Sequence, residues 1–142
     1  MPMFTSLSVV LWDFITGLFF NYRGPKMRIW RIFSDVQGET HFSEREIELR
    51  DAGSIGLLSG LESASGIIFR ETSESYNYLW HNTPRRQYVI ILAGQVDFTV
   101  SDGECHRFGP GEVVLLEDMS GKGHCSRAVA GERRQSIFVT LD

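Results

Sequence analysis

The sequence predicts an all-β domain, built as a sandwich or barrel, that extends from Met27 to Asp142. Three observations support this prediction. Roughly eight or nine short apolar segments follow one another at intervals of about 8–12 residues, turn residues separate them, and no long helical pattern occurs after Met27. With 142 residues, of which 42% are hydrophobic, the chain is long enough to bury one core in a single domain.

Each predicted strand is an apolar or alternating segment bounded by turn-forming residues such as Gly, Pro, Asn, Asp and Ser. In chain order the predicted strands are residues 27–33, 41–50, 66–73, 87–94, 95–103, 104–108, 112–118, 121–130 and 134–141. The clearest is the fifth, where Val96, Phe98 and Val100 alternate with polar residues, as expected for a strand with one buried face. The Gly/Ser-rich residues 51–66 are expected to form a connector.

Residues 1–26 differ from the rest of the chain and are predicted to form an amphipathic extension, helical or irregular. Their apolar residues recur at helical spacing: Phe4, Leu7, Leu11, Phe14, Ile15, Leu18 and Tyr22. A secretory signal is not predicted, because the first cation is Arg23 and no small-residue cleavage site follows. A membrane-spanning helix would place Asp13 near mid-bilayer, at a cost of about 2.5–3.5 kcal/mol. We expect the segment to lie on the surface of the domain or on a partner. One alternative is that it anchors the chain to a membrane, and another is that it is an upstream extension of a reading frame whose domain starts at Met27.

The composition narrows the classes of partner that the chain is expected to bind. The net charge is −4, so no basic surface indicates a nucleic-acid partner. The two cysteines, Cys105 and Cys125, have neither a metal-site spacing nor the pattern of a disulfide framework, which is typical of free thiols in a reducing compartment. We therefore expect a cytoplasmic protein whose partner is a small molecule.

Two groups of polar residues carry the motifs of this chain. The first is His81, Thr83, Gln87 and Gly94, and the second is the turn Pro110-Gly111-Glu112 followed by His124. Together they resemble the two motifs of the cupin superfamily, and residues 80–127 look like part of a small single-domain cupin of unassigned function. In this resemblance His81 fits the first motif histidine and His124 the last. Thr83 stands at the place of a second histidine, and Gln87 at the place of a glutamate.

The resemblance implies a jelly-roll β-barrel with a pocket at its mouth, and a homodimer. Such pockets often hold Fe, Mn, Ni or Zn between three histidines and one glutamate, and this chain departs from that pattern at two of the four positions. His81, Gln87 and His124 could still hold one divalent metal weakly, with Asp118 or Glu117 adding negative charge. A pocket without any cofactor agrees equally well with the residues.

A metal-free pocket has its own chemistry. His81 and His124 could act as general acid or base, because imidazole titrates near neutral pH. An arginine could clamp a carboxylate or enolate through paired hydrogen bonds, although of two adjacent strand arginines only one can face the pocket. The candidate catalytic residues are His81, His124, Arg85 and Gln87, and the candidate ligand-binding residues are Arg86, Thr83, Tyr88 and Asp118.

The expected function is an enzyme of the lyase, isomerase or cyclase type that acts on a polar, anionic metabolite. The first alternative is a non-catalytic cupin that binds or senses a metabolite. A metal-dependent dioxygenase is the third hypothesis, and it is disfavoured because two expected metal ligands are replaced by Thr83 and Gln87.

Overall fold

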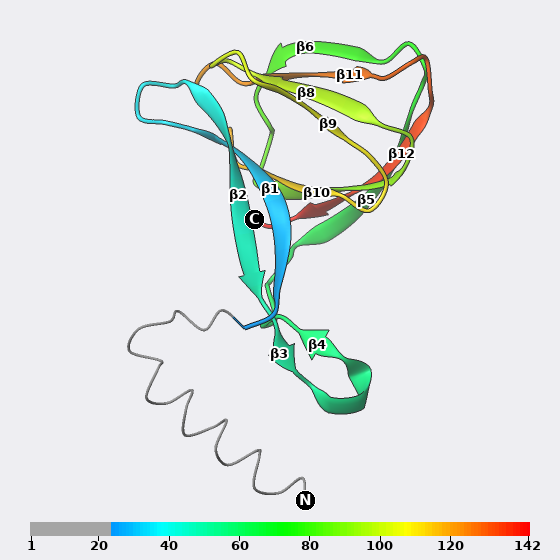
Figure 1. Cartoon of the computed structure of the whole chain (residues 1–142). Helices are drawn as coiled ribbons and strands as arrows, with labels where there is room; N and C mark the ends of the chain where they lie inside the picture. Colours follow the sequence, from blue (N-terminus) through cyan, green and yellow to red (C-terminus); the bar gives the residue numbers. More distant parts are fainter. Residues whose placement is uncertain (1–23) are drawn as a thin grey trace, which may run out of the picture.

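The computed structural model describes residues 24–142, and in them strands form two facing sheets (Figure 1). The strands are β1 (Lys26–Ser34), β2 (Thr40–Glu48), β3 (Arg50–Asp51), β4 (Leu57–Leu58), β5 (Gly66–Thr72), β6 (Asn77–His81), β7 (Gln87–Ala93), β8 (Val96–Val100), β9 (Cys105–Phe108), β10 (Val113–Leu116), β11 (His124–Ala128) and β12 (Arg134–Thr140). The larger sheet has the order β2-β1-β10-β7-β12-β5, and the smaller sheet the order β6-β11-β8-β9.

The strand order is that of a jelly roll. From β5 to β12, the first strand pairs with the last, the second with the seventh, the third with the sixth and the fourth with the fifth, all antiparallel. This pairing pattern arises when one long antiparallel hairpin folds over so that its strands form two sheets. The predicted all-β jelly-roll barrel is therefore confirmed, while the predicted extension at 1–26 lies almost wholly outside the described residues. The β1–β2 hairpin adds to the larger sheet through a parallel pairing of β1 with β10.

The core fills the space between the two sheets because each strand turns alternate side chains inward. The predicted buried face of β8 is confirmed, since Val96, Phe98 and Val100 all lie in the main core. They pack against inward residues of the larger sheet such as Val89 and Ile91. Asp97 is also buried, but it pairs with Arg107 and Arg127. In the described part of the chain, no helix has the length and apolar content needed to cross a bilayer.

Residues 51–66, predicted as a connector, contain a small hairpin. Strands β3 and β4 have two residues each and are joined through a 3-10 turn, Gly53–Ile55. Figure 1 shows this hairpin projecting from the barrel beyond the end of β2. The chain returns to the barrel at Glu62, whose carboxylate accepts a hydrogen bond from the Tyr88 hydroxyl at 2.6 Å.

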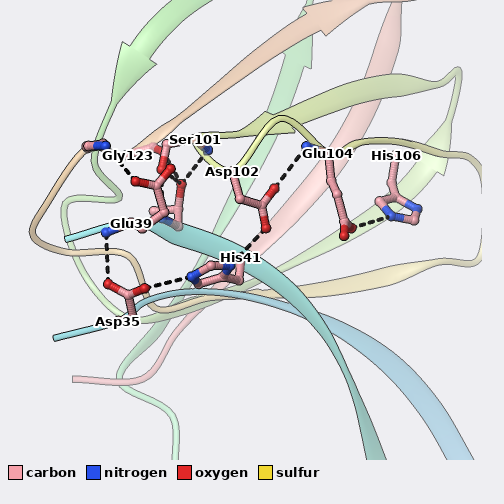
Figure 2. A network of polar contacts seen from close by, with 10 residues as sticks. Asp35, Glu39, His41, Ser101, Asp102, Glu104, His106 and Gly123 are labelled. Carbon is pink, nitrogen blue, oxygen red and sulfur yellow. Dashed lines mark hydrogen bonds and ion pairs between the residues drawn. The ribbon is translucent and has the colours of Figure 1, made fainter. Parts of the chain in front are cut away.

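A clasp centred on His41 ties the β1–β2 hairpin to the turn after β8 (Figure 2). The His41 ring lies between two carboxylates, with Nδ1 2.8 Å from Asp102 Oδ2 and Nε2 2.8 Å from Asp35 Oδ2. These hydrogen bonds, first to Asp35 and then to Asp102, raise the pKa of His41. Next to the clasp, the Thr40 backbone N–H donates to the Ser101 hydroxyl at 2.7 Å. Every polar atom of the His41 ring thus has a partner on the protein.

Candidate functional site

A cavity of about 310 Å³ lies between the two sheets. Its size is at the lower end of the range for small-molecule sites. The larger sheet supplies side chains from β5, β7, β10 and β12, and the smaller sheet supplies side chains from β6, β8 and β11. The lining residues are Arg70, Tyr76, Tyr78, His81, Asn82, Thr83, Pro84, Gln87, Val89, Phe98, Leu116, His124, Ser126, Arg134 and Phe138.

A β-bulge in β6 aims His81 into this cavity. His81 pairs with His124 of β11, and Tyr78 pairs with Ser126, so three steps along β6 match two steps along β11. The extra residue breaks the alternation. As a result Tyr78 and His81 both line the cavity, with their rings 3.7 Å apart, although strict alternation would turn them to opposite faces.

The His124 ring is held by a buried carboxyl group. Its Nδ1 is 2.6 Å from Oδ2 of Asp118, and both residues are almost completely buried. Because a carboxylate can only accept, Nδ1 carries the proton, and Nε2 is the nitrogen left for a ligand. The backbone carbonyl of Asp118 accepts hydrogen bonds from the Thr83 N–H and the Asn82 side-chain amide, which fix the loop that carries the carboxyl group. The His81 and His124 ring centroids are 4.4 Å apart.

His81 is also fixed in one tautomer. Its Nδ1 donates to the Leu79 carbonyl at 2.6 Å, which leaves Nε2 with a lone pair. Burial lowers the pKa of His81, and repulsion from the nearby His124 lowers it further, so the neutral ring is favoured. Gly123 allows the two histidines to come together. It has φ +74°, and a Cβ there would lie 2.3 Å from the His81 carbonyl oxygen.

A buried arginine that the sequence did not single out faces the same cavity. Arg134 is only 2% exposed, and its Nε and Nη1 atoms have no hydrogen-bond partner among the described residues. Burial lowers the pKa of Arg134, and the Arg70 guanidinium adds to this effect. Tyr76 lies between the two cations, with ring-to-Cζ distances of 4.9 Å to Arg70 and 5.1 Å to Arg134. These contacts with the ring face offset only part of the cost of burying two cations.

Further polar atoms of the inner surface are also without partners in the described part of the chain. These are Gln87 Oε1, Thr72 Oγ1, Ser136 Oγ and, behind His124, Asp118 Oδ1. Strand register places Thr72 directly opposite Arg134 on neighbouring strands, and Arg70 opposite Ser136. Buried polar atoms in folded proteins nearly always have partners, so a concentration of unpaired ones beside a cavity indicates a place for a polar ligand.

The structure brings together most of the residues that the motif singled out. His81, Thr83, Gln87 and His124 line the cavity, and Asp118 lies directly behind His124. The Thr83 hydroxyl donates its hydrogen bond to the Arg85 carbonyl at 2.8 Å, so it has no second hydrogen to donate to a ligand.

Three other candidates lie elsewhere. Arg85, Arg86 and Tyr88 are absent from the cavity lining. The Arg86 Nε atom donates to Glu117 at 2.7 Å, and this contact raises the pKa of Arg86. Tyr88 packs in a second apolar cluster with Leu115, away from the cavity core, and its hydroxyl bonds to Glu62. A cation from β12, Arg134, stands in the cavity where the sequence suggested one from residues 85–86.

The donor atoms around the cavity do not fit a divalent transition metal. Two imidazole Nε2 atoms and the neutral Gln87 carbonyl oxygen are the available donors, and residues 24–142 contain no group of three His, Cys, Asp or Glu side chains arranged to hold an ion. Asp118 is not part of the cavity lining; its Oδ2 is hydrogen-bonded to His124, and its buried Oδ1 has no partner among the described residues. Two guanidinium groups in the same lining would also repel a dication.

No protein-family model matches the chain, and neither does any curated protein. Several solved structures are similar to it. A conserved protein of unknown function from Streptococcus pyogenes, SPY1581, is 23% identical over 59% of this chain and 69% of that chain, with a TM-score of 0.45. The cupin domain of Schizosaccharomyces pombe Cnp3 is 14% identical over 86% and 88% of the two chains, with a TM-score of 0.45.

A cupin 2 conserved barrel domain protein from Leptotrichia buccalis is 14% identical over 84% of this chain and 79% of that chain, with a TM-score of 0.41. Two of these three structures are named as cupins. At these identities and TM-scores, none of them assigns an activity or a ligand to this chain.

Proposed function

We propose that this chain is an enzyme that moves a proton within a small organic anion, in a reaction of the lyase, isomerase or cyclase type, without a bound metal. One observation carries the proposal: the buried guanidinium of Arg134, whose Nε and Nη1 atoms have no hydrogen-bond partner among the described residues, shares a cavity with the His81–His124 pair. An isolated buried cation is costly, and a carboxylate or enolate on the ligand would pair with it.

In the proposed reaction the Nε2 atom of His124 takes a proton from a carbon of the ligand. The electrons of the broken C–H bond stay on the ligand as an enolate, whose negative charge faces Arg134. The proton returns to another atom of the ligand in an isomerisation, or to the leaving group in an elimination. Asp118 keeps His124 in the tautomer that this step requires.

The remaining residues orient the ligand. Gln87 Oε1 would accept a hydrogen bond from a ligand hydroxyl, because no described residue donates to it. The neutral His81 would hold a second oxygen or relay the proton. Phe98 and Phe138 form apolar walls, so the ligand has an apolar part beside its anionic group.

Binding of simple carboxylates tests the anion site. Thermal shift and calorimetry with acetate, benzoate and a 2-oxo acid should give binding that Arg134→Met weakens by about 10–100-fold and Arg134→Lys retains in part. Arg133→Met is the matched control, because Arg133 is exposed and pairs with Glu74. Binding that is indifferent to Arg134→Met would contradict the proposed anion site.

Hydrogen exchange distinguishes the proposed enzyme from a non-catalytic binding protein. This alternative would use the same unpaired groups to hold a ligand. In D₂O, an enzyme should exchange the carbon-bound proton next to the ligand carbonyl, and His124→Ala should stop that exchange while binding persists. A protein that binds tightly but never accelerates exchange or turnover of any ligand in the panel would support the sensory alternative.

A further inference from the structure

We infer that the ligand of the cavity is a small dicarboxylate, with one carboxylate held by Arg134 and the second by Arg70. This second anion site rests on the proposed function, in which Arg134 binds the anionic group beside the reacting carbon. Two guanidinium groups line the one cavity, and neither forms an ion pair with a described residue.

Arg70 is the second cation of the cavity wall. Its side chain is partly exposed, and its Cζ atom lies 4.9 Å from the Tyr76 ring centroid and 5.0 Å from the Phe138 ring centroid. Contact with aromatic rings holds the flat guanidinium in place but uses none of its N–H donors. Within residues 24–142 Arg70 has no hydrogen bond to a side chain or ion pair, so these donors are left for a ligand.

The cavity has no carboxylate of its own to balance the two cations. Among the described residues, the lining contains no Asp or Glu side chain. Opposite charges on facing strand positions stabilise sheets, yet here the register puts Thr72 opposite Arg134 and Ser136 opposite Arg70. The Asp118 carboxyl group lies outside the lining, against His124. A ligand with two negative charges would therefore offset two otherwise uncompensated positive charges.

The two cations stand at different places along the cavity, which favours two anionic groups over one. Arg134 is 2% exposed, whereas Arg70 is partly exposed, so they lie at different depths. On neighbouring antiparallel strands the two residues are diagonal to each other, an arrangement that sets Cα atoms roughly 7–8 Å apart. In a cavity of about 310 Å³, a short molecule with a carboxylate at each end reaches both.

The charge of Arg70 also acts on the imidazole pair. Burial lowers the pKa of His81 most, and the positive charges of His124 and Arg70 lower it further. The second cation therefore faces the same space as the imidazoles, and a ligand that pairs with Arg70 stays within reach of His81.

Calorimetry with charge-matched pairs of probes tests the second carboxylate. Succinate and glutarate are dicarboxylates, and succinamate and glutaramate are monoanions of nearly the same shape, in which one carboxylate is replaced by a neutral amide. The better dicarboxylate should bind the full chain about 10-fold or more tightly than its monoamide, because a second charge-assisted hydrogen bond forms. Equal affinities within both pairs would overturn the inference.

Substitution of Arg70 assigns the second site. Arg70→Met should remove the preference for the dicarboxylate and change the affinity for the monoamide much less, and Arg70→Lys should keep part of the preference. Arg127→Met is the matched control, because Arg127 is exposed on β11 and absent from the lining. Circular dichroism checks the fold of each variant. A preference that survives Arg70→Met, or that is lost with Arg127→Met, would contradict the assignment.

Failure of the second site is distinguishable from failure of the proposed function. Monoamides that bind through Arg134 without any gain from a second carboxylate would refute the second site alone. Probes that are all indifferent to Arg134→Met would refute the anion site of the proposed function as well. Sulfate carries both charges on one compact group, so sulfate that binds as tightly as the better dicarboxylate, and needs both arginines, would overturn the two-carboxylate inference.

Discussion

The chain places histidines in two opposite environments, the clasp at His41 and the cavity pair His81–His124. At the clasp, both ring nitrogens contact carboxylates on the surface, and the pKa of His41 is raised. In the cavity, backbone and carboxyl groups occupy only the Nδ1 atoms, and burial lowers the pKa of His81.

The difference separates a structural histidine from a candidate catalytic one. A ring whose two nitrogens are both used by the protein holds two segments together and has nothing left for a ligand. A ring that is fixed at one nitrogen has a preset tautomer, and its second nitrogen is left without a protein partner and can bind a ligand. The unpaired atoms of Arg134 and Gln87 beside His124 strengthen this distinction, because the clasp has no such neighbours among the described residues.

The largest expected effect comes from substitutions in the cavity, which test whether its histidines differ in function from His41. If the proposed reaction is correct, His124→Ala and Asp118→Asn should each lower its rate by about 10²–10⁴-fold, because one removes the proposed base and the other disturbs its tautomer. His41→Ala should leave turnover within about twofold of the wild type. Steady-state kinetics with circular dichroism as the fold control would check this, and equal losses in all three variants would show that the two histidine sites are not different in kind.

The next largest effect concerns the unpaired guanidinium atoms of Arg134, which the cavity has and the clasp lacks. Arg134→Met should reduce the affinity for a carboxylate ligand by about 10–100-fold, since a charge-assisted hydrogen bond is lost. The same change should raise the unfolding temperature of the ligand-free protein by roughly 2–5 °C, because an unpaired buried cation is removed. Calorimetry of binding and unfolding measures both quantities. Arg133→Met should change neither, and a ligand-free Arg134→Met protein that melts lower would mean that the guanidinium stabilises the fold.

Titration of the individual rings compares the two environments directly. Imidazole C–H resonances followed by NMR should give a midpoint above the ordinary histidine value of about 6.5 for His41 and below it for His81. His41→Ala and His81→Gln variants would assign the signals. Coincident midpoints would remove the electrostatic basis of the comparison.

The smallest expected effect concerns the stability supplied by the clasp. Because the folded-state pKa of His41 is raised, its contribution is fully present below about pH 6.5 and is lost as the pH rises through the raised value. At the acid end, the pKa of Asp35 is lowered, so its contribution is present above 3.8 and is lost as the pH falls through the lowered value. Urea unfolding should therefore show a larger destabilisation by His41→Ala at pH 5.5 than at pH 8.5. A difference that is independent of pH would contradict the ionic nature of the clasp.

Most of the fold could be predicted because its strands are short and amphipathic. The alternation around Val96, Phe98 and Val100 survives in the structure, since one face of β8 is buried and register is set by that face. The hairpin inside residues 51–66 could not be predicted, because a two-residue strand leaves no periodic pattern.

The candidate site was accessible to sequence reasoning only where a motif spans it. His81, Gln87 and His124 followed from the resemblance. Arg134 did not, although Arg133-Arg134 repeats the pattern of two adjacent arginines at a strand end that drew attention to residues 85–86. Which arginine of which pair faces the cavity depends on the pairing of β12 with β5 and β7, and strand pairing is a long-range property that local spacing does not encode.

The bulge in β6 has a consequence for how this protein tolerates change. Deleting one residue at the Leu79–Trp80 step would match two steps along β6 with two along β11, so that Tyr78 and His81 would still share the inner face, now by strict alternation. Loss of the bulge at unchanged length would instead turn either Tyr78 or His81 out of the barrel, so the register of β6 on β11, as well as residue identity, decides whether the two imidazoles meet.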